Sequence, residues 1–174
     1  EGNPASLIDV VGVTPVNFVN YASPNFNAVN YLIITHASLK TNSAGNNPIF
    51  DYQAYRQSPQ GGSYNTLDVD IDALYNQFSY GIVHHPLAIR NFCHFIKNNW
   101  TDPEYIFLIG KGREYQDVRG QASNLLIPTF GYPPSDNVML ASIDSDEPVI
   151  ALGRLSALTG DQVSLYLQKI IDVE

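Results

Sequence analysis

The chain has 174 residues, of which 44% are hydrophobic and 15% are charged, a size and composition typical of one globular domain. Nine Lys and Arg residues against 17 Asp and Glu residues give a formal net charge of −8, and no segment concentrates basic residues, so we expect no nucleic-acid partner. No apolar run approaches the roughly 20 residues that a membrane-spanning helix needs, and we expect no membrane insertion by this segment.

Short β-rich pieces and continuous apolar runs predict the strands. Residues 1–29 are expected to form a β-rich lead-in segment, because Leu7–Val11 and Val16–Val19 suit a hairpin or a covering strand pair. Two later runs, Tyr31–Thr35 and Tyr105–Ile109, are apolar throughout, which is typical of strands buried on both faces. The other expected strands are Asn65–Ile71, a short one at Asn137–Ala141, and Val149–Leu152.

Amphipathic stretches between these runs predict the helices. A helix that opens at His85 and Pro86 has an apolar stripe at i, i+3, i+4 and i+7, formed by Ile89, Phe92, Cys93 and Ile96. The last helix begins at Thr159, which forms a capping box with Gln162. The other expected helices are Pro48–Ser58 and Asp72–Phe78.

The strand Asn65–Ile71 alternates apolar residues with Asp68 and Asp70, so one of its faces is expected to be solvated near a sheet edge. Asp68, Asp70 and Asp72 imitate the start of a calcium loop. An EF-hand loop also needs Gly at its sixth position and Glu at its twelfth, and neither is present. We interpret these residues as surface acids that lead into a helix N-terminus, and the sequence leaves metal binding undetermined.

Buried strands that alternate with amphipathic helices predict an α/β fold, with an open, mostly parallel sheet covered by helices on both faces, as in flavodoxin-like domains. We assign this subdomain to residues 30–174. The chain starts without Met and stops inside a helical pattern, so we expect it to be cut from a longer chain. Function in such sheets usually lies at the carboxyl ends of the strands, where His36, Lys111 and Arg154 are candidate cleft-rim positions.

Known motifs do not identify a catalytic residue or a cofactor in this chain. Gly110-Lys111-Gly112 lacks the third glycine of a dinucleotide fingerprint. The polar loop from Thr35 to Gly45 could cradle a phosphate, although a plain surface loop fits its length better. Cys93 lies on an apolar helix stripe and points about 100° away from His94, so we expect a buried core thiol.

Several of these pieces occur in an order that is similar to a known family. The pieces are Tyr31–Thr35, Tyr55-Arg56, Leu74–Gly81, Ala88–Phe92, Pro103–Gly110, Pro128-Thr129, Ser135-Asp136 and Ile150–Leu155. This succession resembles the first half of the gingipain-like cysteine peptidases, including the sortase-like members of the type IX secretion apparatus. The resemblance covers about residue 30 to the end. Lys111 departs from it, because the family often has Asp there.

The resemblance implies half of a caspase-like catalytic region, in which two subdomains lie side by side and the second holds the catalytic His and Cys. This chain would then be the first, non-catalytic subdomain of a secreted or cell-surface endopeptidase. Asp136 joins the candidate cleft-rim positions on the same ground. The implied partners are the downstream catalytic subdomain and a protein or peptide substrate, with no cofactor. A free-standing flavodoxin-like domain that binds phosphate or flavin, or a scaffold domain without catalysis, remains an alternative.

Overall fold

A computed structural model describes residues 12, 15, 16, 18–118, 122–142 and 144–174, and four strands within them form one sheet. The order across the sheet is β2-β1-β3-β4, and all three neighbouring pairs are parallel. The strands are β1 (Tyr31–Thr35), β2 (Thr66–Asp70), β3 (Tyr105–Ile109) and β4 (Ala151–Leu155). The predicted parallel sheet is therefore confirmed, and β1 and β3 have the bounds that their apolar runs predicted.

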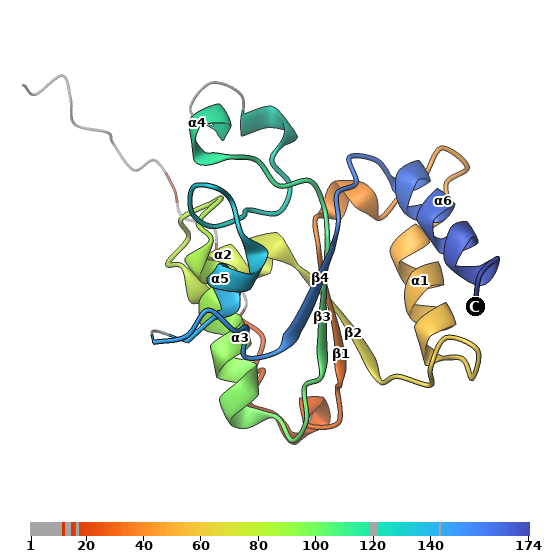
Figure 1. The fold of residues 1–174 in the computed structure, drawn as a ribbon, viewed down its shortest axis with the longest axis horizontal. Coiled ribbons are helices and arrows are strands. Elements are labelled where there is room, and N and C mark those ends of the chain that lie inside the picture. Colours follow the sequence, from red (N-terminus) through yellow and green to blue (C-terminus); the bar gives the residue numbers. More distant parts are fainter. Residues whose placement is uncertain (1–11, 13–14, 17, 119–121, 143) are drawn as a thin grey trace, which may run out of the picture.

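Helices cover both faces of this sheet, as predicted (Figure 1). One face carries α1 (Pro48–Gln57) and α6 (Gly160–Ile171), which pack against each other. The other face carries α2 (Ile71–Phe78), α3 (Leu87–Asn99) and α5 (Asp136–Leu140). A short helix, α4 (Tyr115–Val118), lies in the connection after β3. No helix among the described residues is long and apolar enough to cross a membrane.

The core lies on both faces of the sheet, and one part of it forms where the two central strands meet α3. The predicted stripe of α3 is fully buried, because Ile89, Phe92, Cys93 and Ile96 each expose 0% of their surface. The Trp100 indole N–H donates to the Tyr21 carbonyl oxygen over 2.8 Å, which fastens the segment before β1 to the end of α3. A buried Trp N–H needs such a partner, so this contact fixes the entry into the sheet.

Three predicted strands differ from the structure. Residues 137–141 were expected to be a strand, but Asp136–Leu140 is the helix α5, because the Ser135 side chain caps it by accepting from the Val138 N–H. The last strand was predicted at Val149–Leu152 but runs from Ala151 to Leu155, in register with all five residues of β3. Val16, Phe18 and Val19 form no strand, and Leu7–Val11 lies outside the described residues.

β2 lies at an edge of the sheet, as expected, but the expected solvation of Asp68 is wrong. The Nζ atom of Lys40 lies 2.7 Å from Asp68 Oδ2 and forms an ion pair with it. The Asp68 side chain is only 17% exposed. Burial raises the pKa of Asp68, while the hydrogen bond and charge of Lys40 oppose that rise. Asp70 behaves as expected, because its carboxylate caps α2 by accepting from the Asp72 N–H over 3.0 Å.

One long edge of the sheet is formed by β4. Within the described residues β4 pairs only with β3, and its residues Ala151 and Gly153 are exposed. The Leu155 carbonyl accepts from the Gly110 N–H and so points toward β3. Since backbone groups alternate along a strand, those of Leu152 and Arg154 point to the open edge. Such an edge is a template for pairing with another strand.

Candidate functional site

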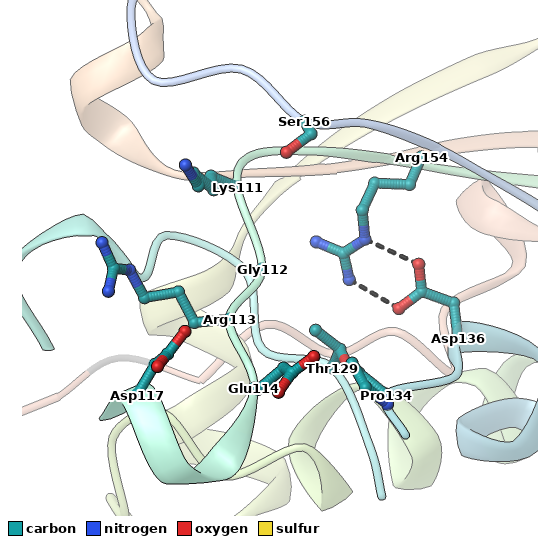
Figure 2. Close-up of a pocket in the computed structure, with 10 residues that line it drawn as sticks. All are labelled: Lys111, Gly112, Arg113, Glu114, Asp117, Thr129, Pro134, Asp136, Arg154 and Ser156. Carbon is teal, nitrogen blue, oxygen red and sulfur yellow. Dashed lines mark hydrogen bonds and ion pairs between the residues drawn. The ribbon is translucent and has the colours of Figure 1, made fainter. Parts of the chain in front are cut away.

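A cavity of about 380 Å³ opens at the carboxyl ends of β3 and β4. It is lined by three of the four positions that the sequence singled out, namely Lys111, Asp136 and Arg154 (Figure 2). This is the end of a parallel sheet at which ligands usually bind. The structure thus brings together residues from β4, from the start of α5 and from the loop after β3.

Arg154 is the centre of this site. Its Nε and one Nη donate to the two carboxylate oxygens of Asp136 over 2.6 and 2.8 Å. The remaining N–H groups reach three backbone carbonyls, those of Gly110, Ile127 and Pro128, over 2.8 to 3.0 Å. A guanidinium has five N–H donors, and all five bonds are made within the chain. Arg154 therefore positions the cavity wall and has no donor left for a ligand.

Two glycines let the chain fold tightly around that guanidinium. Gly110 has φ +153°, and a Cβ added there would lie 2.5 Å from Ile127. A Cβ on Gly112 would lie 2.4 Å from Thr129. Between them, the Lys111 carbonyl accepts from the Leu126 and Ile127 N–H groups. The Gly-Lys-Gly sequence thus makes room for residues 126–129, and a larger residue at either glycine would force them away.

The ionic groups of the cavity form two sets. Figure 2 shows Lys111 and Arg113 extending on one side, while Arg154 and Asp136 face each other on the other side. Lys111 and Arg113 are half-buried, whereas Glu114 and Asp117 are exposed. Asp136 and Arg154 neutralise each other, which leaves the cations Lys111 and Arg113 and the more exposed acids Glu114 and Asp117 as the other charges of the lining.

Sequence reasoning missed Arg113 and Thr129 as lining residues. Both lie beside features that it did identify, since Arg113 follows the Gly-Lys-Gly turn and Thr129 belongs to the Pro128-Thr129 pair. The close approach of Gly112 to Thr129 brings the two segments together, and no local sequence pattern indicates such a contact.

His36 does not join this cavity. It follows β1 and begins the short 3-10 turn Ala37–Leu39, where its side chain accepts from the Ser38 N–H. Its Nδ1 also lies 2.8 Å from the Ser38 hydroxyl. The imidazole therefore caps a turn, and the predicted cleft-rim positions divide into one group of three and this separate residue.

In the loop from Thr35 to Gly45, both hydrogen-bond donors of Ser43 are occupied. The N–H and the hydroxyl of Ser43 both donate to Asp161 Oδ1, over 2.9 and 2.7 Å. These bonds hold the pKa of Asp161 below its ordinary value. The Asp161 carboxylate thus occupies the Ser43 donors that a phosphate in this loop could use, whereas the buried Thr35 hydroxyl of the same loop has no hydrogen-bond partner among the described residues.

The only cysteine of the chain lies in the core. Cys93 is 0% exposed and burial raises the pKa of its thiol, which makes the nucleophilic thiolate rare. No group of three or more His, Cys, Asp or Glu side chains among the described residues is arranged to hold a metal ion.

Comparison with known proteins identifies a family and a related fold. A family model described as peptidase family C25 matches residues 25–174. A crystal structure of dimeric latent PorU from Porphyromonas gingivalis superimposes with a TM-score of 0.54 at 17% sequence identity, over 82% of this chain and 15% of that chain. The likeness to this structure shows a shared fold, and this chain spans a small part of that protein's length. No curated protein sequence matches.

Proposed function

Because this chain belongs to peptidase family C25, we propose that it is the N-terminal, non-catalytic subdomain of a gingipain-like cysteine endopeptidase. Its task is to support a catalytic subdomain in the same polypeptide and to form one rim of the substrate cleft. The catalytic His and Cys belong to that other subdomain. The parent protein acts outside the cell, either secreted or at the cell surface.

The burial of Cys93 supports the non-catalytic role in this proposal, whose peptidase parent rests on the family match. A cysteine peptidase needs a thiolate within hydrogen-bond reach of an imidazole and open to the substrate. The single thiol of this chain is enclosed by the core on α3, where burial raises its pKa. In the proposed peptidase, another part of the polypeptide would then supply the reactive thiol.

The open edge of β4 supports the proposed partner. The backbone groups of Leu152 and Arg154 face that edge, and pairing with a strand of the catalytic subdomain would extend the parallel sheet. Two exposed residues of the same strand, Ala151 and Gly153, are small. A backbone of the partner could therefore approach closely.

Association of the two subdomains tests the proposal. This chain and the proposed catalytic subdomain would be produced as separate polypeptides, with an affinity tag on one of them. We expect co-purification and elution as one complex in size-exclusion chromatography. Two stable monomers that do not bind each other would contradict the supporting role and would favour a self-sufficient scaffold domain.

A further inference from the structure

A second cavity, of about 400 Å³, adjoins the one at the strand ends. The two cavities share Arg113 and Thr129 as lining residues. Most of the second wall is apolar, and it includes Val118, Leu125, Pro128, Phe130 and Tyr132. An aromatic or branched aliphatic side chain fits the chemistry of this wall, and the first cavity would then lie directly beside it.

The residues shared by the cavities carry unpaired polar atoms. Arg113 Nε and Thr129 Oγ1 are both buried, and neither has a hydrogen-bond partner within the described residues. Buried polar groups are rarely left unpaired, because such a group loses its bonds to water without compensation. At this junction an N–H donor and a hydroxyl are thus left for an acceptor that is not part of the described chain.

The charges around the junction favour an anionic acceptor. Neither Lys111 nor Arg113 forms an ion pair with a described acidic residue. Glu114 and Asp117 also line the first cavity but are exposed, so water screens their charges more strongly than those of the half-buried cations. The charges of Lys111 and Arg113 are therefore the less screened ones that an incoming carboxylate would meet.

From these observations we propose that the two cavities form one binding site for a polypeptide segment in which a large apolar side chain lies next to a carboxylate. The apolar side chain occupies the second cavity. The carboxylate accepts from the Arg113 Nε–H and the Thr129 hydroxyl and lies near Lys111. This inference rests on the proposed function in taking a polypeptide as the ligand, and it makes the site a recognition surface away from the reacting thiol.

The test measures binding of four short peptides to this chain alone by calorimetry and by amide chemical shifts. The probes are acetyl-Gly-Gly-Phe with a free C-terminus, the same peptide as its amide, and amidated acetyl-Gly-Phe-Glu-Gly and acetyl-Gly-Phe-Gln-Gly. We expect a carboxylate probe to bind about 10-fold to 100-fold more tightly than its neutral counterpart, since hydrogen bonds to charged groups are the strong ones. Preference for the free C-terminus identifies a chain end as the ligand, and preference for Glu identifies an internal acidic residue.

Substitutions in the lining of the two cavities test where the peptides bind. Arg113→Gln should remove the preference for the carboxylate, and Phe130→Ala should weaken all four probes, because Phe130 belongs to the apolar wall. Lys97→Gln, at an exposed position of α3, is the control and should leave binding unchanged. Equal binding of acids and their neutral counterparts, absence of binding by all probes, or an unchanged preference in a folded Arg113→Gln variant would overturn the proposal. None of these outcomes concerns association with the catalytic subdomain, so the two proposals fail separately.

Discussion

Arg154 of β4 donates to both carboxylate oxygens of Asp136, the first residue of α5, over 2.6 and 2.8 Å. The pair joins the edge of the sheet to the helix that follows the cavity loop. Because the same guanidinium also binds three backbone carbonyls, one side chain holds the carboxyl ends of β3 and β4 against residues 127–128. The geometry of the cavity therefore depends on this contact.

Arg154→Lys should destabilise the fold although it keeps the charge. An ammonium cannot reproduce the paired bonds to Asp136, and it leaves buried carbonyls unpaired. We expect a loss of about 2–4 kcal/mol in the free energy of unfolding by urea titration. Lys97→Gln, at an exposed site, should change it by less than about 0.5 kcal/mol. A loss as small as that control's would show that Arg154 does not organise the strand ends.

Cys93 should not react with a thiol reagent while the protein is folded. The thiol is fully buried and its pKa is raised by that burial, so both access and thiolate are lacking. Labelling should become complete in denaturant. As a control, Asn98→Cys in a Cys93→Ala background places a thiol at an exposed position of α3 and should react at once. Immediate stoichiometric labelling of the folded wild type would contradict the position assigned to Cys93.

Lys40→Met should destabilise the protein more at neutral than at acid pH. Burial raises the pKa of Asp68 in the folded state, so the stabilisation linked to this group is complete below the ordinary Asp pKa and decreases as pH rises through the folded value. Removing Lys40 removes the charge that opposes this rise. The unpaired Asp68 carboxylate should then lower the free energy of unfolding by about 1–2 kcal/mol at pH 7.

The loss in the free energy of unfolding caused by Lys40→Met should become smaller as the pH falls toward 4. The reason is that, as the pH falls, Asp68 becomes protonated at a higher pH in the folded variant than in the unfolded chain. Urea unfolding of the wild type and the variant at pH 4.5 and pH 7 measures this difference. Lys97→Met, at an exposed position, serves as the control. An equal deficit at both pH values would show that the contact between Lys40 and Asp68 is not electrostatic.

The sequence predicted those parts of the fold in which one local pattern dominates. Tyr31–Thr35 and Tyr105–Ile109 are central strands because their continuous apolar runs can be buried only between two helical layers. The short segment after Ser135 was misassigned because five residues carry too little periodicity to separate helix from strand. Its capping signal, Ser135 followed by Asp136, was present but was interpreted only as part of a family resemblance.

The candidate site was predictable in position but not in its internal contacts. Strand ends pointed to Lys111 and Arg154, and both line the cavity. The partnership of Arg154 with Asp136 spans 18 residues and arises from the packing of α5, which no local pattern encodes. His36 occupied an equivalent strand end, yet its contacts are local, since it caps the next turn. Which strand end becomes a cavity is decided by tertiary packing.

Gly153→Lys should block the proposed docking of the catalytic subdomain while leaving this chain folded. A Cβ at Gly153 would lie 3.5 Å from the Phe107 ring, which is an ordinary contact, and the residue is exposed on β4. A lysine on an edge strand opposes strand pairing. The variant should keep its thermal midpoint but lose co-purification with the tagged catalytic subdomain.

The matched control for Gly153→Lys is Asn98→Lys, which adds the same charge at an exposed position of α3, away from the β4 edge. It should retain the complex. If Gly153→Lys co-purifies as well as this control does, the subdomains associate through a surface other than the β4 edge.

Hydrolysis of fluorogenic peptides under reducing conditions tests the central claim most directly. The assay compares this chain, a polypeptide that joins it to the proposed catalytic subdomain, and the Cys93→Ala variant of each, with folding checked by circular dichroism. We predict no turnover by this chain alone, turnover by the joined polypeptide, and full retention of that turnover in Cys93→Ala. Turnover by this chain that disappears in its folded Cys93→Ala variant would contradict the assignment of a non-catalytic subdomain.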